Sequence, residues 1–541
     1  MADAKPTFYI TTPIYYVNDR PHIGHAYTTT LCDIAARFQR FAGRDVHFLT
    51  GTDEHGHKVE KSARERGVSP QSLADANSAE FRKVLGLLNL TNDDFIRTTE
   101  PRHTAQVQSF VKRLIDSGDV YVGEYEGWYD EGQEEYVTDT KAAEQEYKSV
   151  ISGRPLVKAR ERNYFFRLSK YQKPLEALFE TQPDFVRPEA RRNEVLGRLR
   201  EGLQDIPISR TNFTWGIPVP GDEQHVIYVW VDALFNYVTA LGGAGQPDRT
   251  RFWPADYHVV GKEILFFHAV IWPALLMALG LPTPRCVYAH SFWIAEGRKM
   301  SKSLGNFIDL EAVQDYTATF SLDAFRWFLA TQGPLGATDA DFSRAKFIEV
   351  YNTDLANTLG NCANRVANMI GRYFDGAIPD PGAASPRGAQ VCASIPGADV
   401  FHWPKLCAEG ACTAAGQYNR FELADALTTG LDIVRKVDLY IETTKPFSLA
   451  KVPDRKADLA LVLYQCAEAL RIASLILWPA LPAKIETLWK TYGLAIDPAR
   501  GEFAKLSAWG GTQPGTPIAK ADPLFPRFIE PASPASTSAK A

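Results

Sequence analysis

The sequence predicts an α/β protein with a parallel sheet, a smaller inserted domain and a C-terminal bundle of helices. Three observations support this prediction. Strand-like and helix-like segments alternate in the first hundred residues, which is typical of a parallel sheet. Residues 118–221 interrupt this alternation with short, aromatic-rich stretches. From about Tyr316 onward, apolar residues recur only at helical spacing.

The first strand is expected at residues 8–12, and a loop with Pro and Asn-Asp turn signals follows at 13–21. A helix opens at His22, runs through Phe38 and ends at Gly43. The next strand, 46–49, leads into the polar segment 50–56. Strand, helix and strand in this order predict a parallel sheet with ligands at the strand ends.

Residues 118–221 are expected to be an insertion with its own small fold. Short strands are predicted at 121–122, 127–129 and 136–137, with dense acidic residues between 124 and 146. The α/β pattern then resumes. It comprises strands at 226–231 and 258–261, an apolar helix over 264–279, and a strand at 286–289.

The remaining chain is predicted to be helical. Helices are expected at 325–331, 346–374, 417–443 and 457–477, and a Pro/Gly/Ala-rich loop of low order at 379–410. The predicted boundaries are 1–117 and 222–315 for the two halves of the sheet domain, 118–221 for the insertion, 316–350 for a linker, 351–525 for the helical domain, and 526–541 for a disordered tail.

The composition limits the classes of protein that the chain can be. It has 541 residues, 45% hydrophobic and 23% charged, which are ordinary values for a globular protein. The formal net charge of −5 argues against a general polyanion binder, although a local basic patch could still bind phosphates. The N-terminus lacks the layout of a signal peptide, and no run of about 18 apolar residues is apparent. We expect a cytoplasmic protein without membrane contact.

Two histidines stand three residues apart in His22-Ile23-Gly24-His25, where a loop gives way to a helix. A helix N-terminus offers free backbone N–H groups and a positive dipole end, which suit phosphate. Gly24 removes a side chain where a ligand could approach closely. Taken alone, however, this pattern is more often a plain helix start with exposed histidines.

A second motif is the glycine-bounded segment 297–305, which contains Lys299-Met300-Ser301-Lys302-Ser303. A flexible loop with lysines can close over a triphosphate and neutralise charge as it develops. Taken alone, it fits a solvated basic turn equally well.

Together the two motifs resemble the paired signatures of the class I aminoacyl-tRNA synthetases in order, spacing and α/β context. The segments 12–18, 51–56, 230–233, 261–268 and 359–365 resemble the methionyl-tRNA synthetase family, and the resemblance extends from Phe8 to about Lys490. It implies a Rossmann-type catalytic domain, an inserted connective domain and an all-α anticodon-binding domain. It also implies that methionine is activated with ATP and Mg²⁺ and then transferred to tRNA(Met), including initiator tRNA.

The same resemblance assigns residues to the site. The implied catalytic residues are His22, His25, Lys299 and Lys302, the lysines stabilising the pyrophosphate leaving group. The implied ATP-binding residues are His22, Gly24, His25, Gly261, Glu263, His290, Lys299, Ser301 and Lys302. The implied methionine-binding residues are Ile14, Tyr16, Asp53, Trp230, Ala233, Leu234, Tyr237, Ile264, His268 and Trp272. Asp53 would meet the amino group, and the apolar residues would form the slot for the thioether.

Recognition of tRNA is implied at Asn361 and Arg365, which lie one helical turn apart. The family also offers a tryptophan for stacking in a Pro-Trp pair, and this chain has Pro446-Phe447 there. Phenylalanine still stacks, but with less surface and no N–H group.

The sequence departs from the family in two further places. Many members bind zinc through Cys pairs in the inserted domain, whereas Asp130 and Gln133 stand at those positions here. The seven cysteines include no CxxC pair, so neither structural zinc nor a disulfide framework is expected. Some members carry an added C-terminal barrel that dimerises them. Because this chain ends in a disordered-looking tail, a monomer is expected.

Three other readings compete with this one, and the first is a different class I synthetase, such as a cysteinyl or a branched-chain enzyme. A cysteinyl enzyme should show thiolate zinc ligands, and a branched-chain enzyme should carry a large editing domain in place of residues 118–221. A catalytically inactive relative that only binds RNA would not need His22, His25, Lys299, Lys302 and Asp53. A small nucleotidylyltransferase would share the ATP motifs but would not need the long helical domain.

Overall fold

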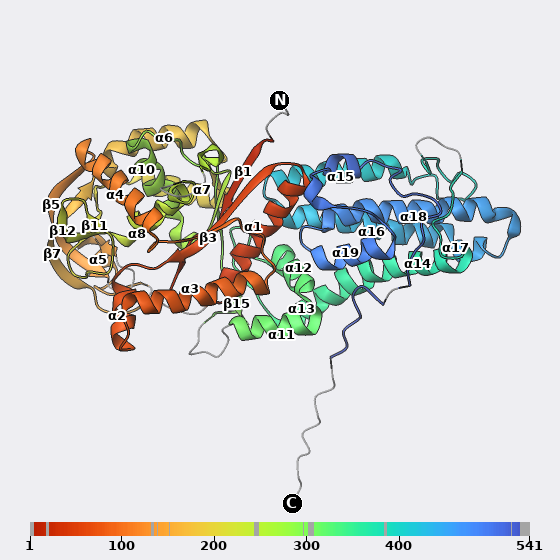
Figure 1. The fold of residues 1–541 in the computed structure, drawn as a ribbon, viewed down its shortest axis with the longest axis horizontal. Coiled ribbons are helices and arrows are strands. Elements are labelled where there is room, and N and C mark those ends of the chain that lie inside the picture. The colour runs from red at the N-terminus through yellow and green to blue at the C-terminus, as the bar shows by residue number, and fades with distance from the viewer. Residues whose placement is uncertain are drawn as a thin grey trace, which may run out of the picture.

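The structure is a computed structural model that describes residues 5–17, 21–130, 135–137, 139–150, 152–242, 248–295, 297–300, 308–382, 387–520 and 522–530. The molecule is elongated, with an α/β part at one end and a helical bundle at the other (Figure 1). The first helix, α1 (Ile23–Phe41), lies between these two parts. The arrangement predicted from the sequence is therefore confirmed in outline.

In the described chain, seven strands form one parallel sheet. They are β1 (Thr7–Thr11), β2 (Tyr15–Tyr16), β3 (Asp45–Asp53), β4 (Asp94–Arg97), β8 (Val186–Arg187), β13 (Tyr257–Gly261) and β14 (Val287–His290). The order is β2-β3-β1-β13-β14-β8, and β4 also pairs with β3. Because β1 has β3 on one side and β13 on the other, the strand order reverses there. Parallel sheets of this kind bind ligands at that point, beyond the carboxyl ends of the strands.

Helices cover this sheet and connect its strands. They include α1, α2 (His57–Glu65), α3 (Pro70–Leu87), α4 (Pro101–Asp116) and α10 (Trp272–Ala278). α1 is buried along most of its length, and the chain leaves it at Ala42 and Gly43. Gly43 has φ +90°, a conformation that favours glycine, so the predicted helix end is confirmed.

The region predicted as an insertion contains an antiparallel four-stranded sheet. Its strands are β5 (Val120–Asp130), β6 (Glu135–Val137), β7 (Val157–Phe166) and β9 (Ile206–Pro207), accompanied by α5 (Asp139–Glu144), α6 (Gln172–Thr181) and α7 (Glu189–Arg200). Two of the predicted short strands are one long strand, β5, because it pairs with β7 from Val120 to Tyr129 without a break. Within the same region, β8 pairs with β14, so this segment contributes a strand to the central sheet.

The strand predicted at 226–231 is present only at residues 226 and 227, and the rest of the prediction is wrong. β12 (Asp222–Ile227) ends two residues before helix α8 (Val229–Leu234), and β12 pairs with β10 (Ser209–Arg210) and β11 (Pro218–Val219) outside the central sheet. A short, fully apolar run does not distinguish a buried strand from a buried helix. α9 (Asn236–Thr239) follows directly.

The apolar helix predicted at 264–279 is present but irregular. It comprises a 3₁₀ turn (Lys262–Ile264), a π-helical segment (Phe267–Ile271) and α10. After β14, the chain forms β15 (Trp293–Ala295), β16 (Arg298–Lys299), α11 (Leu310–Phe320), α12 (Leu322–Gln332) and β17 (Ala340–Asp341). The two-residue strand β17 is an exception to the purely helical region predicted from Tyr316 onward.

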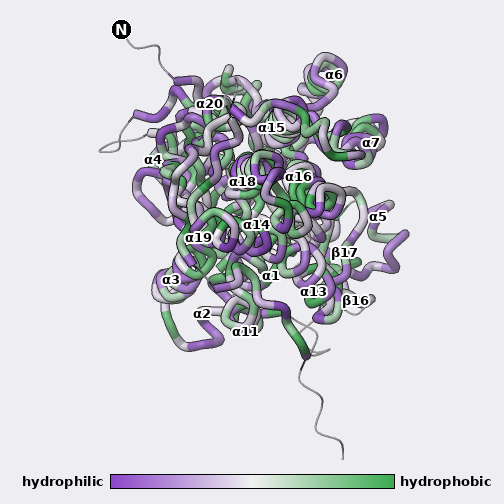
Figure 2. The backbone as a smooth tube through the Cα atoms, turned by 90° about the vertical axis from the view of Figure 1, so that its right-hand side faces the viewer, coloured by the Kyte–Doolittle hydropathy of each residue, from purple (hydrophilic) through white to green (hydrophobic). Residues whose placement is uncertain are grey.

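The second part of the molecule is a helical bundle. Its elements are α13 (Arg344–Val350), a π-helical segment (Tyr351–Gly360), α14 (Asn361–Tyr373), α15 (Trp403–Asn419), α16 (Leu423–Thr444), α17 (Pro446–Leu449), α18 (Lys456–Leu477), α19 (Pro482–Thr491) and α20 (Phe503–Leu506). In the end-on view, α18 lies in the middle, with α14, α15, α16 and α19 around it (Figure 2).

Three predictions in this part are corrected. The helix predicted at 417–443 is two helices, because the chain turns at Phe421, which has φ +60°. The low-order loop 379–410 ends at His402, where α15 begins, and Cys392, Ile395 and Phe401 are buried before it. The disordered tail was predicted to begin at residue 526, but residues 526 and 528 still contact the bundle. The Tyr351 hydroxyl donates to the Pro526 carbonyl, and the Asn352 side chain pairs with the Phe528 backbone. Residues 531–541 lie outside the described residues.

One described helical stretch, Pro453–Leu477, is long and apolar enough to cross a membrane by length and composition. It contains no unbroken apolar run of about 18 residues, because Gln465, Glu468 and Arg471 interrupt the apolar sequence. Its apolar window is entirely buried inside the bundle.

Candidate active site

A cavity of about 320 Å³ opens at the carboxyl edge of the parallel sheet, where the strand order reverses between β1 and β13. This volume is within the range of small-molecule sites. The ends of β3, β13 and β14, the N-terminus of α1 and the helix α8 all contribute to its walls. Residues that lie more than 250 positions apart in the chain therefore face one space.

The cavity gathers most of the residues predicted from the sequence. On the side of α1, β13 and β14 its walls include His22, Gly24, His25, Gly261, Glu263 and His290. On the side of α8 and β3 they include Ile14, Tyr16, Asp53, Trp230, Ala233, Leu234, Tyr237, Ile264 and His268. Five lining residues were missed: Pro13, Tyr15, Thr28, Asn236 and Phe292. Helical spacing could have found two of them, because Thr28 lies one turn after Gly24 and Asn236 one turn after Ala233.

The start of α1 fixes the two histidines of the first motif. His22 caps the helix, its Nδ1 accepting the Gly24 N–H at 3.0 Å, and His25 Nδ1 accepts the His22 N–H at 3.2 Å. The neutral ring of His25 therefore carries its proton on Nε2, from which it can donate to a ligand. Burial, and then the neighbouring His22, hold the pKa of His25 well below its usual value. The helix N-terminus and the Nε2–H of His25 together suit an anionic ligand.

Gly24 and Gly261 are both needed for close packing at this end of the cavity. A Cβ at Gly24 would lie 2.8 Å from His22 Cε1, and one at Gly261 would lie 2.3 Å from Glu263 Oε2. The Glu263 carboxylate is accessible from the cavity but enclosed by surrounding protein, and this desolvation raises its pKa.

His290 also lies at this end, held between two partners. Its Nδ1 is 2.8 Å from the Ser291 carbonyl and its Nε2 is 2.7 Å from the Thr28 hydroxyl. Since the carbonyl can only accept, the ring is protonated on Nδ1 and accepts from Thr28. Burial lowers the pKa of His290 to about 4, so the ring is neutral at physiological pH.

The opposite end is apolar and aromatic. Trp230 stacks on Phe267 with ring centroids 4.1 Å apart, and the Tyr237 hydroxyl lies 2.8 Å from His268 Nε2. His268 donates from Nδ1 to the Ile264 carbonyl, and burial lowers its pKa to about 4. Asp53, the last residue of β3, is 4% exposed and supplies a carboxylate to this otherwise apolar end.

Trp272 was predicted in the same slot, but it does not line the cavity. It is fully buried one layer behind, where its Nε1 donates to His258 Nε2 at 3.3 Å. Its ring centroid is 6.0 Å from that of Tyr237, so it supports a residue of the wall.

The lysine-rich motif is only partly visible. β16 places the Lys299 backbone opposite Ile294 of β15, and β15 pairs with β17. Ser301 and Lys302 lie outside the described residues, as does the side chain of Lys299. Their predicted roles therefore stay predictions.

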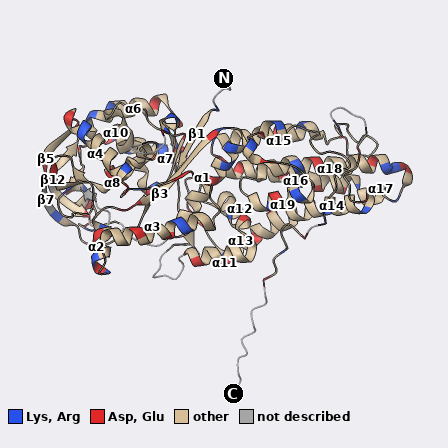
Figure 3. Cartoon of the chain, in the orientation of Figure 1, with Lys and Arg blue, Asp and Glu red and all other residues tan. Residues whose placement is uncertain are grey.

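The residues predicted to read an anticodon lie far from the cavity, in the helical bundle. Asn361 is exposed at the start of α14, and Arg365, one turn on, forms a 3.0 Å ion pair with Asp438 of α16. Phe447 in α17 is 48% exposed, which is unusual for a large apolar side chain. Acidic and basic residues are interspersed along this part of the molecule (Figure 3).

Among the described residues, no group of three or more His, Cys, Asp or Glu side chains is placed to hold a metal ion. Asp130 is 2% exposed on β5, and Gln133 lies outside the described residues. The described cysteines are free, and all except Cys412 are buried. A second cavity of about 290 Å³, between α14, α19 and residues 518–524, contains none of the predicted site residues.

Known proteins match both the sequence and the fold. A family model described as "tRNA synthetases class I (M)" matches residues 8–145 and 141–367. The methionine–tRNA ligase of Rhizobium meliloti is 42% identical, covering 98% of this chain and 100% of its own length. That of Halalkalibacterium halodurans is 41% identical, covering 98% of this chain and 79% of its own length.

The solved structure of Mycobacterium tuberculosis methionyl-tRNA synthetase in complex with methionyl-adenylate is similar with a TM-score of 0.87. It is 36% identical and covers 96% of this chain and 100% of its own. The fold and the match to the class I model define a class I aminoacyl-tRNA synthetase architecture. Within that class, the chain belongs to the methionine–tRNA ligase family. The family resemblance found in the sequence is confirmed.

Proposed function

We infer that the chain activates methionine with ATP, forming methionyl-adenylate and pyrophosphate, and then transfers methionine to the terminal adenosine of tRNA(Met), initiator tRNA included. The observation that carries this inference is one cavity with two chemically different ends. The α1 N-terminus and the Nε2–H of His25 suit phosphate, and the aromatic slot beside Asp53 suits an amino acid with an apolar side chain.

The chemistry follows from this arrangement. The methionine carboxylate attacks the α-phosphate of ATP, and pyrophosphate leaves with the electron pair of the broken P–O bond. No side chain needs to act as a nucleophile, so the protein contributes position and charge stabilisation. We assign Asp53 to the amino group, and His22, His25, Gly261, Glu263 and His290 to ATP. Lys299, Ser301 and Lys302 are assigned to its phosphates. In the second step, the 2′-hydroxyl of the terminal adenosine takes the methionyl group and AMP leaves.

We propose that Mg²⁺ accompanies ATP and that the chain holds no structural zinc. The second proposal is supported by the residues available in the inserted domain, since carboxylate and amide oxygens replace poorly the four thiolates of a structural zinc site. Stoichiometric zinc in metal analysis of the purified protein would contradict it.

We also propose that the enzyme acts in the cytoplasm as a monomer. A dimer mass in light scattering at micromolar concentration would contradict the monomer.

The test of the proposed function is ATP–pyrophosphate exchange with each of the twenty amino acids. Exchange with methionine alone is expected. Exchange with a different amino acid would keep the adenylation chemistry and overturn the assignment of the slot. No exchange with any amino acid would favour the reading in which the protein only binds RNA.

A further inference from the structure

We propose that Asp232, His55 and His103 form a buried clamp that positions the methionine-binding walls of the cavity. This inference rests on the proposed function and names positioning residues for it. None of the three side chains lines the cavity, so each acts through residues that do.

Asp232 is the centre of the clamp. It lies fully buried in α8, the helix that presents Trp230, Ala233 and Leu234 to the cavity. Its Oδ2 is 2.7 Å from His55 Nδ1, and its Oδ1 is 2.7 Å from His103 Nε2. Each carboxylate oxygen therefore meets an imidazole from a different part of the chain. Burial alone would raise the pKa of Asp232, but His55 and the hydrogen bonds from both imidazoles hold it below its usual value.

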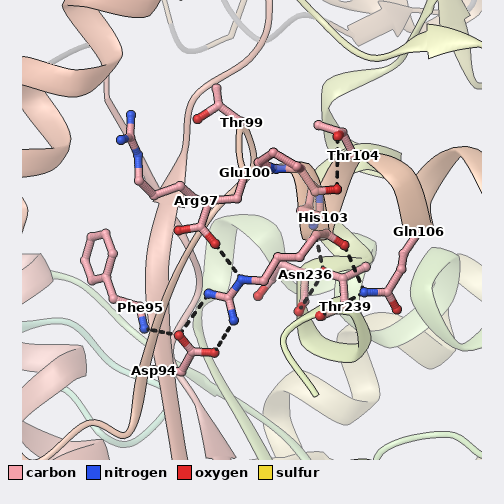
Figure 4. A network of polar contacts seen from close by, with 12 residues as sticks. Asp94, Phe95, Arg97, Thr99, Glu100, His103, Thr104, Gln106, Asn236 and Thr239 are labelled. Carbon is pink, nitrogen blue, oxygen red and sulfur yellow. Dashed lines mark hydrogen bonds and ion pairs between the residues drawn. The ribbon is translucent and has the colours of Figure 1, made fainter. Parts of the chain in front are cut away.

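The His103 arm connects α4 to the wall. His103 is fully buried, and its Nδ1 lies 2.7 Å from the Thr239 hydroxyl of α9 (Figure 4). One turn further along α4, Gln106 Nε2 donates to the Thr239 carbonyl at 3.1 Å. α4 is itself anchored to the central sheet, because Arg102 forms two hydrogen bonds with Asp94 at 2.7 and 2.9 Å. α9 contributes Asn236 to the cavity, and Asn236 Nδ2 donates to the Ala233 carbonyl at 2.7 Å.

The His55 arm connects the clamp to the carboxyl end of β3. His55 lies two residues after Asp53, and its carbonyl accepts the Tyr16 hydroxyl at 3.2 Å. Its ring packs edge-on against Trp215 with centroids 5.5 Å apart. One buried carboxylate thus holds the helix that carries the apolar slot against the segment that carries Asp53.

This geometry gives the clamp a selective role. It fixes the two walls assigned to methionine relative to each other. The walls assigned to ATP, at the N-terminus of α1 and at His290, make none of its hydrogen bonds. Loss of the clamp should therefore weaken methionine binding and leave ATP binding nearly unchanged, because displacement of a binding group by about 1 Å already costs much of its effect.

The experiment is steady-state ATP–pyrophosphate exchange at varied methionine and varied ATP. Asp232→Asn replaces one of the two accepting oxygens with an amide NH2, which then faces an imidazole N–H, so one contact is lost or must reverse. We expect KM for methionine to rise about tenfold or more and KM for ATP to stay within about twofold. Equal changes in both KM values, or no change in either, would overturn the proposal.

Substitutions at His55 and His103 test the hydrogen bonds of the two side chains rather than the volume that the side chains fill. His55→Asn keeps an N–H donor near the Nδ1 position, whereas His55→Leu removes it. Likewise, His103→Gln keeps a donor near Nε2, and His103→Leu does not. The leucine variants should reproduce the rise in methionine KM, while the amide variants should recover most of the wild-type value. If the leucine variant and the amide variant at the same position had the same kinetics, the result would contradict the clamp. This test holds even if Asp232→Asn fails to fold.

Glu468→Gln is the matched control, because Glu468 is an equally buried carboxylate that lies in α18, outside the cavity. It should lower stability and leave both KM values unchanged. The same selective rise in this variant would overturn the proposal.

Wild-type protein without methionine-dependent exchange would overturn the proposed function and this inference together. Wild-type exchange without a selective effect of Asp232→Asn would overturn this inference alone.

Discussion

Three histidines in the cavity, His25, His268 and His290, are held as neutral rings by burial, which lowers the pKa of each, and by partners that fix their tautomers. His268 and His290 each donate from Nδ1 to a carbonyl and accept at Nε2 from a hydroxyl. His25 presents its Nε2–H instead, because its Nδ1 accepts a backbone N–H. The same residue type thus acts as a donor to ligand or as part of a rigid wall, depending on whether the backbone group at Nδ1 donates or accepts a hydrogen bond.

The lowered pKa values of His268 and His290 predict a pH-dependent stability. Both are about 4 in the folded protein, against about 6.5 for an unperturbed histidine. Between these values the unfolded chain binds more protons, so stability should fall as pH decreases from about 6.5 to about 4. The slope is at most about 1.4 kcal/mol per pH unit for each ring.

Thermal unfolding across this pH range, compared between wild type and His268→Gln, measures the contribution of one ring. The variant should lose less stability on acidification. His402→Gln, at an exposed imidazole, should follow the wild-type profile. A His268→Gln profile parallel to wild type would contradict the assignment of His268 as a buried neutral ring.

Gly261→Ala should impair activation without unfolding the protein. The new Cβ would collide with the Glu263 carboxylate at 2.3 Å and displace it from the ATP end of the cavity. We expect activation to slow by on the order of 10–100-fold, measured by ATP–pyrophosphate exchange. Gly86→Ala in α3 is the control, since nothing lies within 4 Å of its Cβ position. Unchanged exchange in Gly261→Ala would remove this glycine from the site.

At the scale of elements, the central helix of the bundle depends on a buried carboxylate. Glu468 of α18 forms an ion pair with Arg471 at 2.6 Å and accepts backbone N–H groups from Gly510, Gly511 and Thr512. Burial would raise the pKa of Glu468, but Arg471 and these donors hold it below its usual value. The stabilisation is therefore present above about pH 4.5 and lost as pH falls below that value.

Glu468→Gln should destabilise the bundle by about 3–5 kcal/mol, because it leaves the Arg471 guanidinium buried without its counter-charge. Denaturant unfolding measures this cost, and amide hydrogen exchange should accelerate at residues 510–512. Glu409→Gln, in an exposed pair with Lys405 on α15, should have no measurable effect. Equal stability of the two variants would contradict the role of Glu468.

At the scale of the whole molecule, the two parts are joined by a buried ion pair. Asp33 of α1 and Arg326 of α12 are fully buried with an N–O distance of 2.7 Å. Arg326 also donates to the Pro479 and Ala480 carbonyls, which lie between α18 and α19. The helix that begins with His22 is thereby linked to the bundle that carries Arg365.

Asp33→Asn should cost about 3–5 kcal/mol of stability, because the buried Arg326 guanidinium would lose the carboxylate that is paired with it directly. Calorimetric unfolding measures the loss. Asp116→Asn, which removes a charge from the exposed pair with Lys112, is the control and should change little. A similar melting temperature for Asp33→Asn and wild type would show that the junction does not depend on this pair.

Arg365→Ala should separate the two steps of the reaction. Arg365 lies in the bundle, far from the cavity, so methionine activation should be nearly unchanged. Charging of tRNA should weaken by about 10–100-fold, as for loss of one specific base contact. Arg372→Ala, two turns along the same helix, removes the same charge and should retain charging. Equal losses in activation and charging for Arg365→Ala would point to a folding defect.

The sequence by itself determined what local chemistry can encode. Periodicity predicted β1, α1 and β14, and Gly43 marked the end of α1 because few other residues adopt its backbone conformation. The two motifs and the segments between them determined the family, and through it fifteen residues that the cavity brings together. Apolar runs were less informative, since the run at 226–231 suits either a strand or a helix, and only packing around the cavity decided for α8.

Only the tertiary structure decided which residues stand behind the site. Trp272 has the residue type of a pocket wall but lies one layer deeper, and Asp232, His55 and His103 meet although up to 177 positions separate them. Nor could the sequence place the Asp33–Arg326 pair between the two parts, because its residues lie 293 positions apart. The physical reason is that a local pattern records which face of an element is buried, whereas buried charges find their partners only when distant elements pack together.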